Sequence, residues 1–325
     1  MAGATVARYN GGEVNKTRRN GMESYVIETQ NLTKRYGEVK SVSDVSLHVR
    51  PGRIYGLLGR NGAGKTTTMK LLLGLIAPTS GGVRLFGKPL AGNERRALPR
   101  IGSLIESPGF YPNLTGTENL RIFARLRGVD EDAVRRALSV VGLPHRDRKL
   151  FSQYSLGMKQ RLAIALAILH DPQLLILDEP VNGLDPIGIA EMRAFIRRLC
   201  DERGKTILIS SHILPEIALL ADDVGILDRG FLLEEESMRQ LEEKNERYAR
   251  LTVSDPAKAK RLLGEIYPSL TIARRGDALR LPGDADMASL LRVLVQNDVD
   301  VREARICEDT LEDYFKRVTG GEGIA

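Results

Sequence analysis

The sequence contains no tryptophan, and aromatic residues make up only 5% of its 325 positions. Aliphatic side chains must therefore build most of any core. There are two cysteines, Cys200 and Cys307, and they lie far apart in the chain. Their separation excludes the close spacing of a thiolate metal site and fits a reducing compartment.

Long apolar runs are also absent. A membrane-spanning helix needs ~20 consecutive apolar residues, and the best candidates, residues 71–77 and 162–169, are far shorter. The amino terminus carries charges but not the apolar segment of a secretory signal. We therefore expect a cytoplasmic chain that cannot itself form a pore.

The balance of charges is basic, with a formal net charge of +6. Such a surface could serve an anionic partner such as nucleic acid, a lipid surface or a nucleotide. It could equally be a solvated, arginine-rich surface, because acids and bases are interleaved along the chain. No basic stripe interleaved with aromatic residues is present, so no nucleic-acid partner is expected.

Three regions differ in their patterning. Residues 1–21 are rich in Gly, Asn and Arg without periodicity, and we expect a disordered extension. In residues 22–240, the segments 45–49 and 53–58 are strand-like, and apolar runs at 174–177 and 206–210 predict buried parallel strands. Helices are expected to alternate with these strands. This alternation predicts an α/β core, and the stretch of about 107–170 predicts a helical insertion in it. Its helices are expected to begin at Thr115 or Thr117, at Asp130 and at Ser155, which are good helix caps.

Residues 241–325 form the third region. Strands are expected at 247–254, 270–273, 278–281 and 301–306, and helices at 257–266, 285–296 and 310–318. The order β-α-β-β-α-β is that of a small α+β, ferredoxin-like unit. It could regulate the chain, help it to dimerise, or only extend its packing.

A phosphate-binding loop lies between an apolar strand and a helix. Residues 59–66, Gly-Arg-Asn-Gly-Ala-Gly-Lys-Thr, match the G-x-x-x-x-G-K-[ST] pattern, in which glycines let backbone N–H groups surround phosphates. Lys65 reaches the terminal phosphates and Thr66 ligates Mg²⁺. The motif is shared by kinases, GTPases and many ATPases, so by itself it indicates a nucleotide. We assign nucleotide binding to the loop and the next threonine: Gly59, Arg60, Asn61, Gly62, Ala63, Gly64, Lys65, Thr66 and Thr67.

Two acids follow the apolar run at 174–177. Asp178 is expected to hold Mg²⁺, and Glu179 to act as the general base toward the attacking water. An acidic turn that caps the next element is the alternative. The phosphate loop upstream favours the catalytic interpretation.

With three further motifs, the chain resembles the ABC ATPase family. Tyr-Ser-Leu-Gly-Met-Lys-Gln-Arg at 154–161 is similar to the family signature, Gly-Leu-Asp at 183–185 to its D-loop, and His212 to its switch histidine. The resemblance implies that Ser155 and Gly157 are presented to the γ-phosphate bound on a second subunit, and that Asp185 touches that subunit. It also implies that His212, with Lys65 and Glu179, belongs to the catalytic set, and that Tyr36 stacks on adenine.

Two departures from the family pattern stand out. Leu156 and Met158 replace the usual Gly and Gln of the signature. Glu106 replaces the Q-loop Gln, which would bring a carboxylate close to Mg²⁺, and we count it among the metal ligands with Thr66 and Asp178.

Glu106 and the residues after it resemble the subgroup that exports peptide antibiotics, in bacitracin resistance and lantibiotic self-protection. This implies an ATPase that works as a homodimer or with a paired ABC subunit, docked on integral-membrane permease subunits at the inner face of the membrane. Contact with the permeases is expected around residues 106–150, with 111–114 as the docking edge. An ABC protein acting on ribosomes or chromosomes is the rival, but it would need a second ATPase core or a long coiled coil. A P-loop kinase or GTPase leaves the later motifs unexplained.

Overall fold

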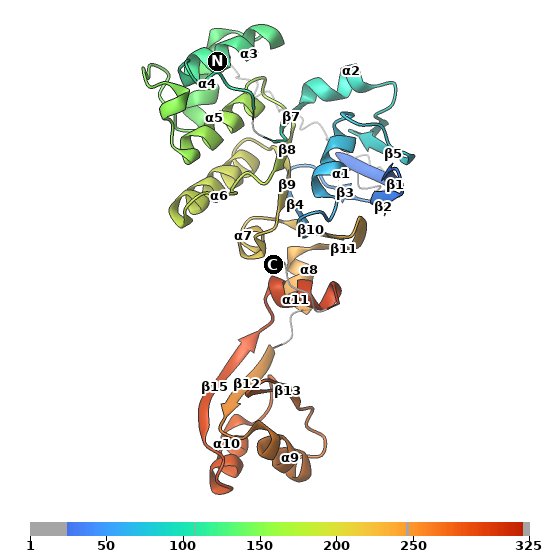
Figure 1. Ribbon diagram of the computed structural model, residues 1–325, viewed down its shortest axis with the longest axis vertical. Coiled ribbons are helices and arrows are strands. Elements are labelled where there is room, and N and C mark those ends of the chain that lie inside the picture. Colours follow the sequence, from blue (N-terminus) through green and yellow to red (C-terminus); the bar gives the residue numbers. More distant parts are fainter. Residues whose placement is uncertain (1–24, 107, 245–246, 321–325) are drawn as a thin grey trace, which may run out of the picture.

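The computed structural model describes residues 25–106, 108–244 and 247–320. The extension predicted at 1–21 lies outside them. In Figure 1 the larger part of the chain forms a layered α/β domain, and the C-terminal strands and helices form a separate lobe below it. Every helix in the described part is too short or too polar to cross a lipid bilayer.

The core of the domain is a six-stranded sheet with the strand order β11-β10-β4-β9-β8-β7. All neighbouring strands are parallel except β10 and β11, which are antiparallel. The strands are β4 (Ile54–Leu58), β7 (Ile101–Leu104), β8 (Leu174–Asp178), β9 (Thr206–Ser211), β10 (Asp223–Asp228) and β11 (Phe231–Ser237). The apolar residues of β8 are fully buried, as expected for a central parallel strand. The predicted α/β core with a largely parallel sheet is therefore confirmed.

A second, antiparallel sheet covers one face. It contains β1 (Ile27–Tyr36), β2 (Val39–Val45), β3 (His48–Val49), β5 (Ser80–Leu85) and β6 (Lys88–Pro89). The single strand predicted over 45–49 is wrong. The chain divides there because its two parts pair with different ends of β1: Val45 lies opposite Leu32, and Val49 opposite Ile27.

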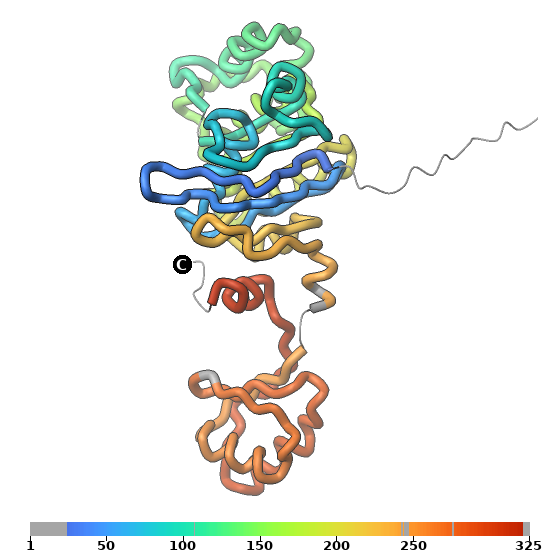
Figure 2. Tube along the Cα trace, turned by 90° about the vertical axis from the view of Figure 1, so that its right-hand side faces the viewer, coloured from blue at the N-terminus to red at the C-terminus, as the bar shows by residue number. Residues whose placement is uncertain are grey.

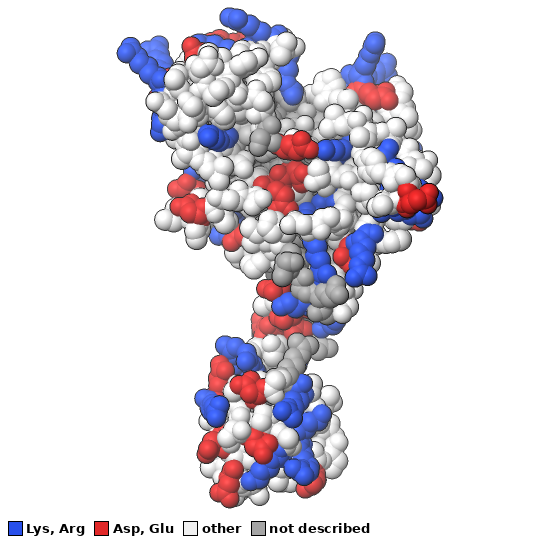
Figure 3. All heavy atoms as spheres, viewed as in Figure 1, with Lys and Arg blue, Asp and Glu red and all other residues white. Residues whose placement is uncertain are grey.

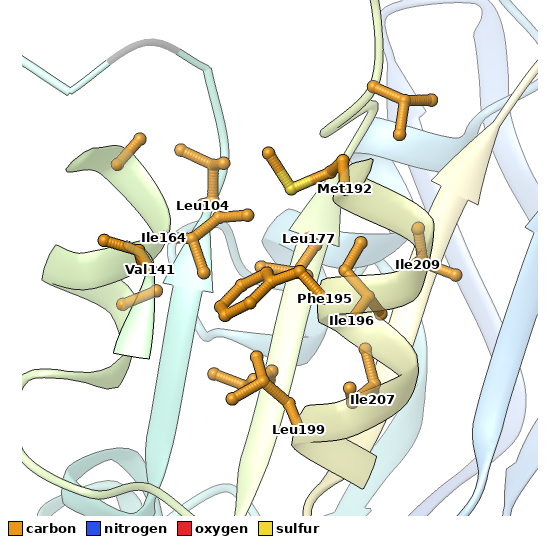
Figure 4. Close-up of a cluster of buried hydrophobic side chains, with 14 of the residues drawn as sticks. Leu104, Val141, Ile164, Leu177, Met192, Phe195, Ile196, Leu199, Ile207 and Ile209 are labelled. Carbon is orange, nitrogen blue, oxygen red and sulfur yellow. The ribbon is translucent and has the colours of Figure 1, made fainter. Parts of the chain in front are cut away.

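Helices cover the core sheet on both sides. Helix α1 (Lys65–Leu72) packs with the antiparallel sheet in one apolar cluster. On the other face, α6 (Pro186–Asp201) and α7 (Leu214–Ala218) pack with the helical subdomain in a second cluster. Figure 4 shows this second cluster, with Phe195 and Ile196 of α6 lying against Leu177 and Ile209 of the sheet.

The helical subdomain contains the three predicted helices, α3 (Gly116–Arg127), α4 (Glu131–Val140) and α5 (Leu156–Ile168). Of the two caps considered for the first helix, Thr115 is the one used, in a reciprocal capping box with Glu118. Asp130 and Ser155 cap the other two. Two short helices, α2 (Glu94–Ala97) and η1 (Leu98–Arg100), precede β7, and a third, η2 (Phe151–Gln153), precedes α5.

Beyond β11, α8 (Met238–Lys244) leads to the C-terminal lobe. The lobe contains β12 (Arg247–Val253), α9 (Pro256–Ile266), β13 (Ala273–Arg275), β14 (Ala278–Pro282), α10 (Met287–Gln296) and β15 (Val301–Glu308). Its strands pair antiparallel in the order β13-β14-β12-β15, and its apolar cluster is its own. The element order is the predicted one. The hairpin begins at Ala273 rather than at 270, because Leu270 closes a turn onto Tyr267 at the end of α9.

The last helix, α11 (Leu311–Val318), does not pack with the lobe. Its Tyr314 and Phe315 belong to the apolar cluster that the core sheet shares with α6, α7 and the helical subdomain. Figures 1 and 2 show it between α8 and the C-terminal strands. The predicted division at residue 241 placed this helix in the accessory unit, whereas its buried side chains join the larger domain.

Candidate active site

The phosphate loop runs from the end of β4 to the first turn of α1, as its motif requires. Gly62 and Gly64 have φ angles of 80° and 105°, which favour glycine. A Cβ on Gly64 would also lie 2.4 Å from the carbonyl oxygen of Ser41. The backbone can take this path only because side chains are missing from it.

Lys65 lies inside this loop and is only 5% exposed. Its Nζ donates to the carbonyl oxygen of Gly59 at 2.6 Å and lies 3.3 Å from Oε1 of Glu179. A hollow of about 250 Å³ opens beside it. The hollow is lined by Ser41, Arg60, Asn61, Gly62, Gly64, Lys65, Thr66, Thr67 and Glu179. A buried ammonium group in a ring of glycines is suited to bind phosphate oxygens.

Ser41, on β2, is a lining residue that the motif did not reveal. Its Oγ lies 3.0 Å from Oγ1 of Thr67. The contact joins the antiparallel sheet to the first turn of α1. No local pattern marks Ser41, because its role depends on a pairing across 26 residues.

Asp178 ends β8 beside Thr66. The hydroxyl of Thr66 donates to Oδ2 of Asp178 at 2.7 Å, and the hydroxyl of Ser210 donates to Oδ1. Ser210 also accepts the backbone N–H of Glu179 at 2.9 Å. Sequence reasoning missed Ser210, although a polar residue at the end of the apolar strand β9 was a signal for it.

Glu179 follows with a left-handed φ of 48°, which turns its side chain away from the strand. Its Oε2 lies 2.8 Å from Nδ1 of His212, and its Oε1 lies near Lys65. The structure thus brings together the three predicted catalytic residues from three different segments. Parallel strands make this possible, because the carboxyl ends of β4, β8 and β9 meet at one edge of the sheet.

Glu106 pairs with a cation. Its carboxylate accepts from Nζ of Lys70 at 2.7 Å, and the Lys70 ammonium holds the pKa of Glu106 below its ordinary value. Glu106 and Asp178 line a common hollow of about 680 Å³. Within the described residues no group of three His, Cys, Asp or Glu side chains is arranged to hold a metal ion. The metal role of Glu106 stays a prediction, and Lys70 is a partner that the sequence did not suggest.

Ser155 and Gly157 are not among the described residues that line the phosphate-loop hollow. Three other signature residues, Leu156, Lys159 and Gln160, line the larger hollow of about 680 Å³ together with Asp178 and Glu179. Ser155 caps α5 by accepting the N–H of Met158 at 3.3 Å, and Asp185 caps α6 by accepting the N–H of Gly188 at 2.9 Å. Leu156, which replaces the family's Gly, is half exposed and lies against the D-loop: a Cβ on Gly183 would be 3.0 Å from it.

Tyr36 lies at the end of β1 with 51% of its surface exposed. The ammonium of Lys34 is 5.1 Å from the ring centre. The same hairpin carries Ser41 into the phosphate-loop hollow. An exposed ring at this place is accessible for stacking, which its predicted role requires.

Comparisons with known proteins agree with this geometry. The profile of the ABC transporter family matches residues 42–182, a stretch that includes the phosphate loop, Asp178 and Glu179. The bacitracin transport ATP-binding protein BcrA of Enterococcus faecalis is 50% identical over 303 residues, which cover 93% of this chain and 98% of the relative. The chain belongs to the ABC transporter ATP-binding family.

Two further similarities are informative. The lantibiotic transport ATP-binding protein SrtF of Streptococcus pyogenes is 45% identical over 212 residues, covering 65% of this chain and 91% of the relative. A dimeric bacterial ABC transporter cassette has the same fold, with a TM-score of 0.58 and 25% identity over 66% of this chain and 99% of that one. This ABC chain is therefore an ATP-binding subunit with ATPase chemistry, as the resemblance predicted.

Proposed function

We propose that this ABC ATPase energises the export of a peptide antibiotic through separate membrane permease subunits, working as a dimer at the cytoplasmic face. The observation that carries the ATPase part is the convergence of Lys65, Glu179 and His212 at one sheet edge. The substrate class is supported by the two relatives that are bacitracin and lantibiotic transport proteins and by the similarity to the first over nearly its whole length.

In this proposal Lys65, Glu179 and His212 have different roles in the hydrolytic step. Lys65 neutralises the phosphate oxygens within the loop, and Glu179 accepts the proton of the attacking water. His212 fixes the carboxylate from one side at 2.8 Å. Held between His212 and Lys65, the base is oriented before substrate arrives, so little reorganisation is needed in the reaction.

Thr66 and Asp178 fit a magnesium ion, because their side-chain oxygens lie 2.7 Å apart and hard oxygen donors are the ligands it prefers. When bound there, the ion would neutralise charge that develops on the terminal phosphate. Glu106 would need to leave Lys70 in order to join them.

Dimerisation is proposed because each chain carries half of a complete site. Ser155, Gly157 and Asp185 lie outside the phosphate-loop hollow of their own chain. Gly157 keeps the N-terminal turn of α5 open, since a Cβ there would meet nothing closer than 3.8 Å. This helix terminus suits an anion bound on the second subunit. The dimeric cassette with the same fold supports this arrangement.

Permease docking is proposed at residues 111–114, where Tyr111 is 52% exposed. Behind this loop Asn119 is fully buried, and its side chain accepts the N–H of Tyr111 at 2.7 Å and donates to the carbonyl oxygen of Tyr111 at 3.1 Å. These bonds fix the backbone from which the Tyr111 ring projects, and an exposed aromatic ring suits an interface anchor.

The substrate proposal is tested by expressing the chain with its cognate permease in a host sensitive to bacitracin and to a lantibiotic. We expect the wild-type chain to raise the inhibitory concentration of at least one peptide, and Glu179→Gln not to. Equal protection by both variants would contradict the ATPase-driven mechanism. If a chain with active ATPase protects against neither peptide, the substrate class is wrong while the ATPase assignment stands.

A further inference from the structure

The C-terminal helix α11 packs on the ATPase domain with one apolar face. Thr310 and Asp313 form a capping box at its start, so its first turn is fixed locally. Leu311, Tyr314, Phe315 and Val318 follow the i, i+3, i+4, i+7 spacing of one helix face, and all four belong to or pack against the domain's apolar cluster. Phe315 is fully buried.

Helix α11 packs against α7, and its Tyr314 is hydrogen-bonded to Glu234 of β11. Leu214 and Ile217 of α7 share the apolar cluster with Phe315. Helix α7 begins two residues after His212, and the N–H of Ile213 between them donates to the Oγ of Ser211 at 2.9 Å. On its other side α7 is held by Glu216, which pairs with Arg193 of α6 at 2.6 Å. The short segment that carries His212 is thus supported from behind by α6 and α11.

The start of α11 is tied to the C-terminal lobe by a buried carboxylate. The side chain of Asp309, between β15 and α11, is 1% exposed and pairs with Arg280 of β14 and with Arg317 of α11, each at 3.0 Å. A buried charge held by two cations resists displacement, because losing one partner leaves it uncompensated. The lobe therefore sets where α11 lies.

We propose that Phe315 is a positioning residue for ATP hydrolysis: by packing against α7 it holds His212 in contact with Glu179. The inference rests on the proposed roles of Glu179 and His212. A series of contacts then connects the C-terminal lobe to the catalytic residues, from Arg280 through Asp309 and α11 to α7. A ligand or partner that moves the lobe would change the hydrolysis rate and leave ATP binding intact.

The test is the steady-state ATPase of the full chain carrying Phe315→Ala. We expect kcat to fall about tenfold, because small displacements of a catalytic group are costly, while KM for ATP stays within about twofold. The split is expected because α1, which follows the phosphate loop, packs on the opposite face of the sheet, in the other apolar cluster. Phe315→Leu keeps most of the volume and should recover kcat to within about threefold of wild type. If the alanine variant does not fold, Phe315→Val, which removes less volume, should lower kcat about fivefold at unchanged KM, and a full kcat in that variant would overturn the inference.

Two controls make the result specific. Leu294→Ala removes a fully buried side chain from the separate cluster of the C-terminal lobe and should leave kcat unchanged. In a His212→Ala background, Phe315→Ala should lower the residual kcat no further, since its effect acts through the histidine.

A full kcat in Phe315→Ala, an equal loss with and without His212, or a change in KM alone would overturn the inference. If His212→Ala itself turns over at the wild-type rate, the proposed role of the histidine fails, and this inference fails with it. If His212→Ala loses activity while Phe315→Ala keeps the full kcat, the role of the histidine stands and only the role of Phe315 fails.

Discussion

The two halves of the nucleotide site are built differently. Around the phosphate loop, Lys65, Glu179 and His212 contact one another, so this half is a connected chemical centre within one chain. In the signature half, Ser155 and Asp185 use their side chains to cap their own helices. The groups of that half that remain for a ligand are the N-terminus of α5 and Gly157. One chain thus holds the predicted base and the lysine together, and in the proposed dimer a second chain would close the site.

On the face shown in Figure 3, acidic side chains gather over the middle of the central sheet, between the helical subdomain and α1. Asp178 ends β8, and Glu179 follows it directly in the chain. An acidic centre of this kind repels a nucleotide unless cations offset it. Lys65 supplies one such charge inside the chain, and the dimer would add the helix terminus of α5.

Glu179→Gln should have the largest effect of any single substitution. Glutamine keeps the shape but cannot accept the proton, so kcat should fall by at least about a hundredfold. ATP binding should persist, because the loop and Lys65 are unchanged. Single-turnover hydrolysis together with equilibrium binding of ATP measures both quantities.

Glu243→Gln is the matched control, because its carboxylate is exposed and pairs with Arg239 on α8. It should retain wild-type turnover. Turnover of Glu179→Gln at the wild-type rate would show that the base lies elsewhere and that the connected half is not the chemical centre.

Ser155→Ala should have a smaller effect, and one confined to the dimer. We expect kcat to fall about tenfold through loss of one hydrogen bond to the transferred phosphate, with unchanged ATP binding to the monomer. Loss of the cap should also cost about 1 kcal/mol in the free energy of unfolding.

Asp130→Ala separates the two contributions, since Asp130 caps α4 in the same subdomain. It should lower the melting temperature by a similar amount and leave kcat unchanged. If both variants lose activity equally, Ser155 acts through stability alone.

The smallest effect is expected at Glu131, which joins α4 to α3. A hydrogen bond from Arg121, assisted by His145, lowers the pKa of Glu131 from its ordinary value near 4.5 to about 2. A lowered folded-state pKa means that this stabilisation is present above about pH 4.5 and is lost as the pH falls toward 2. Because the pair is exposed, Glu131→Gln should lower the melting temperature by only about 1–2 °C at pH 7.

The difference between Glu131→Gln and wild type should shrink as the pH is lowered to 3. ATPase activity at pH 7 should not change. Calorimetric melting at several pH values measures the first quantity, and a constant difference would contradict the assigned pKa.

Much of the fold could be predicted because its signals are local. Apolar runs marked β8 and β9, and Thr115, Asp130 and Ser155 marked helix starts through side chains that bond the next turn. The antiparallel sheet was not foreseen. It depends on β1 pairing with β5, about fifty residues away, and β5 carries two glycines in place of an alternating pattern.

The same distinction applies to the site. The phosphate loop, Asp178, Glu179 and His212 are specified by short motifs. Ser41 and Lys70 act through contacts with residues 26 and 36 positions away, so nothing in their own neighbourhood reveals them. For α11 the sequence predicted a helix, but not that its apolar face packs on α7 rather than on the C-terminal lobe.

The most direct test mixes two inactive variants. Lys65→Ala disables the phosphate loop, and Gly157→Asp places a negative charge at the signature, where the monomer has room for a side chain. Each alone should be inactive, and an equal mixture should regain ATPase activity, because a mixed dimer contains one site with an intact loop facing an intact signature. Activity of either variant alone, or a mixture that forms mixed dimers yet stays inactive, would contradict a site shared between two chains.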